Sequence, residues 1–308
     1  MFILGQALIL AGFVLQICNL IIDIRFILSK RHNVTESRNS HFLDFLIFGM
    51  IVLFFVVYLI IFMKRIQIVW VGILLFAGAV FVTTVLLWII TLTKEIRNSA
   101  FSISETLIGI IEARDPNLNG HSLHVQELSL LIYNNLPAGF KRRINEENLK
   151  YAALFHDVGK LGVPEAILNK PAALVPEEWN VMRRHPEISL QILRSLKSFD
   201  VLKEWILYHH ERIDGSGYYG IPGDKIPFAA RLISVADTYS AITMARSYKP
   251  GKTHEEAIEI LKRVEGKQLD TYLVSLFCTI PKEDVVACMD RVKEKISEQT
   301  SVADMLEV

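Results

Sequence analysis

The residues of this chain best suited to chemistry are five histidines and two aspartates between positions 121 and 237. They are His121, His156, Asp157, His185, His209, His210 and Asp237. Each lies at the end of a helix-like apolar segment or on its inward face. A single inward histidine is more often a satisfied core residue, but buried imidazoles and carboxylates in this number need partners, and a shared metal ion provides them. Nitrogen and oxygen ligands without thiolate suit Fe, Mn, Ni or Zn.

The pair His209–His210 opens a polar stretch, residues 208–220, that core packing does not require. Its sequence, YHHERIDGSGYYG, continues with charged residues and three glycines. Adjacent side chains on an α-helix point about 100° apart, so two imidazoles can reach one ion only near the end of the helix. The glycines allow the chain to turn sharply at that point. The stretch therefore predicts a helix end at the pair, followed by a tight loop.

The elements that must position these residues are helices. Apolar residues recur at helical spacing along most of the chain after Thr93, and no segment reads convincingly as part of a sheet. Pro176 and Pro186 suit first-turn positions, and Thr253 with Glu256 forms a capping box. The predicted helices cover 94–115, 122–136, 145–160, 176–185, 186–196, 200–211, 228–246, 253–264, 270–280 and 282–299. The predicted fold class is all-α.

Residues 1–93 differ in composition and are predicted to form a transmembrane region. They hold three apolar runs, 1–22, 42–63 and 66–92, each near the roughly 20 residues that cross the hydrocarbon core. A soluble core helix rarely stays apolar on every face for that length. The first run lacks a basic start and is too long for a signal peptide. We therefore expect three spanning helices, and a helix over 94–112 that connects the third to the rest of the chain.

Basic residues set the expected orientation in the membrane. The first loop holds four lysines and arginines between residues 25 and 38, whereas the second turn holds Lys64 and Arg65. Because cytoplasmic loops carry the excess of basic residues, the C-terminal part is expected to be cytoplasmic. The sequence thus predicts a multi-pass protein of the inner (plasma) membrane.

Charge and cysteine content exclude two other classes of function. The formal net charge is zero, which gives the whole chain no general attraction to DNA or RNA. The three cysteines, Cys18, Cys278 and Cys288, form no CxxC pair. They therefore indicate neither a disulfide framework nor a thiolate metal site.

The order of the polar residues resembles the HD-GYP domain, the branch of the HD phosphohydrolase superfamily that degrades cyclic di-GMP. The resemblance runs from about Glu105 to about Phe277 and does not include the membrane region. Its motifs are EARDPNLNGHS, ALFHDVGKLGVPEAILNKPAALVPEEW, RRHPEIS, HHERIDGSGYYG, ARLISVADTYSAI and RSYK. The resemblance implies an HD-type helical bundle in a domain over 105–308 that has an extra C-terminal helix.

The resemblance also implies a centre of two divalent metal ions, with Fe or Mn preferred over Ni or Zn. The first ion would be held by His121, His156, Asp157 and Asp237, and the second by Asp157, His185, His209 and His210. A hydroxide that bridges the ions would attack the phosphodiester. The products would be linear pGpG and then, more slowly, GMP.

Substrate contacts follow from the same resemblance. Lys160, one turn after His156, would touch the scissile phosphate and help the leaving oxygen. The bases or phosphates of the ligand would be contacted by Asp115, Tyr218, Arg246 and Lys249. Simpler readings stand beside these: Lys160 as a surface lysine, Asp115 as a cap, Tyr218 as a turn aromatic, and the last two as a solvated basic face.

The sequence departs from the family pattern at three positions. Tyr219 replaces the proline of the signature triplet, and proline would fix the backbone there. Asn117 stands where some members place a glutamate that binds a third metal, so two ions are favoured over three. Ser240 occupies a position that is commonly acidic, three residues after Asp237. Glu211 is assigned a structural role, because the two metal sites are already complete.

The sequence is compatible with three functions. The first is a membrane-anchored phosphodiesterase for cyclic di-GMP. The second is the same hydrolase acting on another cyclic dinucleotide or phosphorylated nucleotide, and the third is a non-catalytic module that binds nucleotide or protein. The complete ligand set argues against the third. The expected protein contacts are a homodimer through 94–112 and a diguanylate cyclase-type partner at the loop Gly217–Gly220, and the membrane region would act as an anchor or dimeriser.

Overall fold

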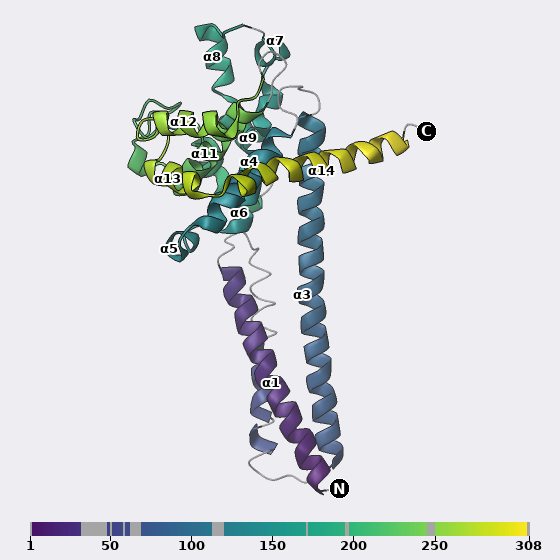
Figure 1. Ribbon diagram of the computed structural model, residues 1–308. Coiled ribbons are helices and arrows are strands. Elements are labelled where there is room, and N and C mark those ends of the chain that lie inside the picture. Colours follow the sequence, from purple (N-terminus) through teal and green to yellow (C-terminus); the bar gives the residue numbers. More distant parts are fainter. Residues whose placement is uncertain are drawn as a thin grey trace. The chain divides into compact units, whose positions relative to one another are not determined.

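The chain is described by a computed structural model (Figure 1) that covers residues 2–31, 48–49, 51–57, 59–61, 69–112, 120–170, 172–194, 197–244 and 250–306. It divides into two compact units, Met1–Phe101 and Ser102–Val308. Within the described ranges both units are built from helices, and the one β-type pairing there is an isolated bridge between Glu265 and Leu269. The predicted all-α fold class is confirmed.

The first unit contains two long apolar helices, α1 (Phe2–Arg31) and α3 (Val69–Glu112). Ile9 of α1 is buried in a small apolar cluster with Leu75 and Ala79 of α3. A polar contact joins the same helices, because the Thr83 hydroxyl donates to the Asn19 side-chain oxygen at 2.9 Å. Such a bond satisfies a polar side chain among apolar neighbours.

Two of the three predicted spans are supported by the described helices. The apolar parts Ala7–Arg25 and Val71–Gly109 are long enough to cross a membrane. The second predicted span, 42–63, lies partly outside the described residues, which include apolar helical turns at 51–57 and 59–61. The structure therefore supports two of the expected spans, and the one over 42–63 stays a prediction. It also shows α3 as one helix from the third apolar run through 94–112.

The second unit begins in the last turns of α3 and continues through short helices. They are α4 (His121–Asn135), α5 (Ala138–Lys141), α6 (Glu146–Phe155), the 3-10 helix η1 (Val158–Gly162), α7 (Glu165–Leu168), α8 (Pro176–Met182), α9 (His185–Leu193), η2 (Lys197–Leu202), α10 (Lys203–Leu207), η3 (Gly223–Lys225), α11 (Phe228–Thr243), α12 (His254–Val264), α13 (Thr271–Thr279) and α14 (Lys282–Leu306). Pro176 and Pro186 lie in first turns, and the capping box of Thr253 and Glu256 is formed, as predicted.

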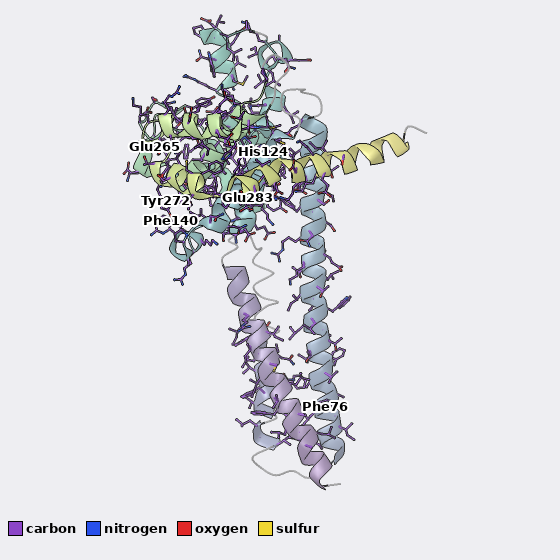
Figure 2. The ribbon with its side chains drawn as sticks, in the orientation of Figure 1. Phe76, His124, Phe140, Glu265, Tyr272 and Glu283 are labelled. Atoms are coloured by element: carbon purple, nitrogen blue, oxygen red, sulfur yellow. The ribbon has the colours of Figure 1, made fainter. Side chains whose placement is uncertain are left out.

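Helix α4 lies at the centre of the second unit and packs against α6, α11, α13 and α14. Four of its apolar side chains are completely buried: Leu123, Val125, Leu128 and Ile132. Each such side chain contributes about 1.5–3 kcal/mol through burial, so α4 is a firm base for the residue at its start. Helices α11, α12 and α13 lie side by side (Figure 1). The short α5 is held by stacking of Phe140 on Tyr272, 4.9 Å between ring centroids (Figure 2).

Candidate metal centre

The seven histidines and aspartates singled out in the sequence come together as two adjacent groups. One group is His121, His156 and Asp237, and the other is Asp157, His185, His209 and His210. Within each group the nitrogen and oxygen atoms that could bind a metal all lie within 4.8 Å of one another. The groups draw on α4, the turn after α6, α9, the turn after α10, and α11. Residues more than a hundred positions apart are thus gathered at one place.

Asp157 connects the two groups through its two carboxylate oxygens. Its Oδ1 lies 3.1 Å from Nε2 of His185 and 3.7 Å from Nε2 of His209. Its Oδ2 lies 3.3 Å from Nε2 of His156 and 3.9 Å from Nε2 of His121. Asp237 completes the first group, with Oδ1 3.1 Å from His121 Nε2. One carboxylate therefore faces both groups, as a ligand shared by two cations would.

The end of α6 places His156 and Asp157. The α-helix stops at Phe155, His156 is its C-cap, and Asp157 adopts φ −105° and ψ 3° before the chain tightens into η1. The prediction of one helix over 145–160 is wrong in this respect. Lys160 consequently lies in η1 rather than one α-helical turn beyond His156, and its ammonium donates to Asp157 Oδ2 at 2.5 Å.

A close contact between η1 and α9 sets His185 against Asp157. A Cβ at Gly159 would lie 1.9 Å from the His185 carbonyl oxygen, so only glycine permits this approach. The Ser189 hydroxyl accepts from Gly159 N–H at 2.8 Å and donates to the His156 carbonyl at 3.2 Å. The sequence reasoning did not identify Gly159 or Ser189. Gly159 lies inside the motif HDVGK and Ser189 ends the motif RRHPEIS, so both were within quoted motifs, although neither was assigned a role.

Three imidazoles are oriented by backbone carbonyls three residues earlier. The Nδ1 atoms of His156, His185 and His209 lie 2.6, 2.8 and 2.6 Å from the carbonyl oxygens of residues 153, 182 and 206. A protonated Nδ1 leaves the lone pair of Nε2 facing the centre, which is the usual arrangement of a metal-binding histidine. These Nε2 atoms are buried and have no hydrogen-bond partner. The same is true of Asp157 Oδ1.

His121 is oriented by a hydroxyl instead. The Ser240 Oγ lies 3.0 Å from Nδ1 of His121 and 3.0 Å from Nδ1 of His124. Ser240 thus serves as the hydrogen-bonding group behind a candidate ligand, where the family pattern has an acidic residue. The backbone nitrogen of Ser122 donates to the buried Glu112 carboxylate at 2.8 Å, which caps α4 beside His121. His124 and Glu112 are supporting residues that the sequence reasoning missed.

The electrostatics of the centre favour bound cations. Burial alone would raise the pKa of Asp157, but Lys160 and His156 outweigh it and hold that pKa well below its usual range. The same balance, with His121 as the main favourable neighbour, lowers the pKa of Asp237. Burial lowers the pKa of His209 and His210, which keeps their imidazoles neutral. The ionised carboxylates and the neutral imidazoles of His209 and His210 suit a divalent cation. Burial lowers the pKa of His156, but the charge of Asp157 outweighs it and raises that pKa to about 8, so a cation bound there would displace a proton from His156.

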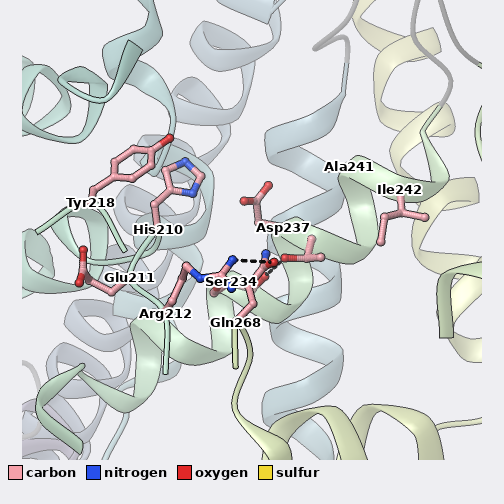
Figure 3. Close-up of a pocket in the computed structure, with 10 residues that line it drawn as sticks. His210, Glu211, Arg212, Tyr218, Ser234, Asp237, Ala241, Ile242 and Gln268 are labelled. Carbon is pink, nitrogen blue, oxygen red and sulfur yellow. Dashed lines mark hydrogen bonds between the residues drawn. The ribbon is translucent and has the colours of Figure 1, made fainter. Parts of the chain in front are cut away.

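A cavity of about 330 Å³ opens beside the centre (Figure 3). His210, Asp237 and Tyr218 line it, together with Ser234 and Gln268. The Tyr218 ring lies 4.7 Å from the His210 ring, and burial followed by the charge of Asp157 raises the pKa of Tyr218 to about 12. Tyr218 is thus in contact with the candidate second site. Asp115, Asn117, Arg246 and Lys249 lie outside the described residues, and their predicted roles stay predictions.

The loop after His210 is fixed by Glu211. One oxygen of this buried carboxylate accepts from Tyr219 N–H at 2.6 Å and the other from Ile221 N–H at 2.8 Å. Proline at position 219 could not donate the first bond. The replacement of the signature proline therefore supplies a hydrogen bond that holds the loop. Arg212 pairs with Asp214 inside the same loop, at 3.1 Å between Nη2 and Oδ2.

Comparison with known proteins agrees with this geometry. Residues 105–273 match the family model described as an HD domain. A probable cyclic di-GMP phosphodiesterase of Vibrio cholerae is 36% identical over 186 residues, which cover 56% of this chain and 42% of that protein. A cyclic di-GMP phosphodiesterase of Thermotoga maritima is 34% identical over 192 residues, 61% of this chain and 51% of that protein.

Another relative carries a different substrate in its name. The 3′3′-cGAMP-specific phosphodiesterase 2 of Vibrio cholerae is 33% identical over 190 residues, 61% of this chain and 36% of that protein. The chain spans about half or less of the length of these curated relatives. The match begins at residue 105, in the last turns of α3, and leaves α1 and most of α3 outside it.

Proposed function

Because this chain belongs to the HD domain family, we propose that it is a membrane-anchored, metal-dependent phosphodiesterase that hydrolyses cyclic di-GMP to pGpG. The observation that carries the proposal is the Asp157 carboxylate, which faces one group of ligands with each oxygen. An open cavity adjoins both groups, because His210 and Asp237 are among its walls. The relatives named as cyclic di-GMP phosphodiesterases support the choice of substrate.

The residues present fit two divalent cations. The buried, unpartnered Nε2 atoms of His156, His185 and His209 are donors that only a cation or a proton would satisfy. The first ion would be held by His121, His156, Asp157 and Asp237, and the second by Asp157, His185, His209 and His210. Bound there, two cations would lower the pKa of a water molecule and neutralise charge on the phosphate. A donor set without thiolate suits Fe, Mn, Ni or Zn, and we propose Fe or Mn because of the resemblance to the HD-GYP domain.

The side chains of the protein itself then orient the reaction. Lys160 lies against Asp157, where its ammonium can neutralise charge on the scissile phosphate and give a proton to the leaving oxygen. Tyr218 covers His210 and limits the access of bulk water to this side of the centre. Asp115, Arg246 and Lys249 are proposed to bind the bases or phosphates of the substrate.

A second candidate substrate is 3′3′-cGAMP. It is supported by relatives of 33% and 38% identity that are named as specific for that dinucleotide. The chemistry at the metal centre would be the same. The choice between the two substrates therefore depends on the groups that recognise the bases.

Membrane anchoring is supported by the two long apolar helices. We propose that they hold the protein in the inner membrane with residues 105–308 in the cytoplasm. A homodimer through 94–112 and a cyclase-type partner at Gly217–Gly220 complete the proposal.

Product analysis tests the proposed function. The full chain, purified in detergent and loaded with Mn²⁺ or, without oxygen, Fe²⁺, would be incubated with cyclic di-GMP and with 3′3′-cGAMP, and the products separated by chromatography. We expect pGpG, and its absence in Asp157→Ala. If the folded, metal-loaded protein leaves cyclic di-GMP intact, the proposal is refuted, and turnover of 3′3′-cGAMP alone would establish the second candidate.

A further inference from the structure

A second cavity, of about 290 Å³, shares His210, Arg212 and Tyr218 with the first. Its other walls include Trp179, Arg183 and Ser216. Ligand pockets usually have roughly 300–1,000 Å³, so this volume suits one part of a dinucleotide rather than the whole molecule. Because His210 borders both cavities, a ligand whose phosphate lies at the centre can extend into either.

Arg183 is the cation that this cavity offers to a ligand. Arg212 is engaged, because its guanidinium donates twice to Asp214 and once to Gln268. In the part of the chain that the structure describes, Arg183 forms no ion pair. Its guanidinium carbon lies 5.5 Å from the centroid of the Tyr218 ring.

Trp179 provides a flat apolar surface beside that cation. Trp179 is 43% exposed, so its ring is accessible to a ligand. Trp179 and Arg183 are four residues apart, and Arg183 N–H donates to the Trp179 carbonyl at 2.9 Å. Residues with this spacing share one face of a helix. Lys170 pairs with Glu178 at 2.6 Å and steadies α8, so the two side chains are presented by an ordered element.

An aromatic plane next to a guanidinium matches the chemistry of guanine. Nucleobases stack on aromatic side chains, and arginine donates two parallel hydrogen bonds to O6 and N7 of guanine. Adenine has an amino group in place of O6, so the hydrogen-bond donor of the arginine would face another donor there. We propose that Trp179 and Arg183 form a guanine subsite for one half of a cyclic dinucleotide. This inference rests on the proposed function and deepens it by naming residues that determine specificity.

Binding measurements that do not depend on turnover test the subsite. The full chain in detergent with Mn²⁺ would be titrated into a fluorescent cyclic di-GMP derivative, and the anisotropy followed at low temperature. Unlabelled cyclic di-GMP and cyclic di-AMP then compete with the probe. The variants are Trp179→Ala and Arg183→Ala. Arg184→Ala is the matched control, because Arg184 is also exposed and does not border the cavity.

We expect Arg183→Ala to weaken cyclic di-GMP roughly tenfold or more and to leave cyclic di-AMP nearly unchanged. Trp179→Ala should weaken both ligands roughly tenfold, since stacking tolerates either base. Arg184→Ala should change neither. Equal weakening of both ligands by Arg183→Ala would indicate that Arg183 contacts phosphate, and it would overturn the guanine subsite. The subsite would also be overturned if Arg183→Ala bound cyclic di-GMP as tightly as wild type, or if wild-type protein did not bind the probe.

Hydrolysis of cyclic di-GMP, measured on the same preparations, separates the two proposals. If wild-type protein binds guanine through Arg183 but yields no pGpG, the proposed function fails and the subsite stands. If wild-type protein yields pGpG and Arg183→Ala hydrolyses cyclic di-GMP with the same KM as wild type, the proposed function stands and the subsite fails.

Discussion

Asp157 is the residue on which both groups of ligands depend, because each of its oxygens faces a different group. Replacing it with alanine should therefore remove both ions, whereas replacing His185 should remove only one. We expect activity to fall by at least about 100-fold in both variants. Even the loss of a residue that only hydrogen-bonds to a metal ligand typically lowers metal affinity or activity about 10–100-fold. Metal analysis of the purified proteins checks this. Loss of a single equivalent in Asp157→Ala would contradict a shared carboxylate.

His124 makes the stability of the domain depend on pH. Burial, followed by the neighbouring His121, lowers the pKa of His124 from 6.5 to about 3. Below pH 6.5, His124 is therefore protonated in the unfolded chain but stays neutral in the folded chain. The contribution of His124 to stability is present above pH 6.5 and is lost as the pH falls. For one such group the free energy of unfolding decreases by up to about 1.4 kcal/mol per pH unit.

The expected result is a flatter pH profile in His124→Gln. Denaturant unfolding of the fragment 102–308, which covers the second compact unit, would be measured from pH 7.5 to pH 5. Other buried histidines also titrate in this range, so the difference between variant and wild type isolates the part due to His124. Parallel profiles for the two proteins would show that His124 is not the neutral group described here.

At the scale of helices and turns, the sequence identified the residues that gather at the candidate centre but not what holds them there. Helical spacing and residue type were enough to place His156 and His209 near helix ends and Asp237 on an inward helix face. The contact of Gly159 with His185 depends on how η1 packs against α9, and helical periodicity carries no information about that. The break after Phe155 also escaped prediction, because the apolar pattern continues through Val158.

Gly159 is the residue that tests this packing. A Cβ there would meet backbone atoms of α9, including the Ser189 nitrogen at 2.5 Å, and no change of rotamer relieves a clash with backbone. Gly159→Ala should move α9 away from Asp157, destabilise the domain by about 1–3 kcal/mol or more, and lower metal content. The control is Gly139→Ala, which meets no atom within 4 Å and should be neutral or slightly stabilising. Normal metal binding in Gly159→Ala would show that the two elements are not so closely packed.

Glu211 holds the loop of residues 211–221 through two hydrogen bonds. One substitution removes both bonds, and another removes only the bond from Tyr219. Glu211→Ala leaves two backbone N–H groups without their carboxylate and should cost about 2 kcal/mol of unfolding free energy. Tyr219→Pro removes one of the two backbone donors, together with the ring contact with Tyr208 and the phenol's hydrogen bond with Glu187, and it stiffens the unfolded chain. We expect a loss smaller than that of Glu211→Ala. Denaturant unfolding of fragment 102–308 measures both. A stabilising Tyr219→Pro would mean that the family's proline suits this loop better than the bond that tyrosine provides.

At the scale of the whole molecule, the two apolar helices are the part of the chain that the proposed membrane anchoring depends on. Asn19 is fully buried against Thr83, and polar residues inside spanning helices are retained where they bond to a neighbouring helix. The sequence predicted α1 and α3 as spans from composition alone. It also predicted the run 42–63 as a span, and that prediction lies partly outside the described residues.

The orientation of the chain is the last prediction. We expect the second unit to lie in the cytoplasm on the side of the basic first loop, because cytoplasmic loops carry the excess of lysine and arginine. We expect green fluorescent protein fused after Val308 to fluoresce and alkaline phosphatase at the same position to be inactive. Fusions near residue 65, in the second turn, should give the opposite pair of results if three spans are present. Fluorescent protein and inactive phosphatase at both positions would place the second turn in the cytoplasm, with an even number of spans after it. Active phosphatase after Val308 would overturn the proposed topology.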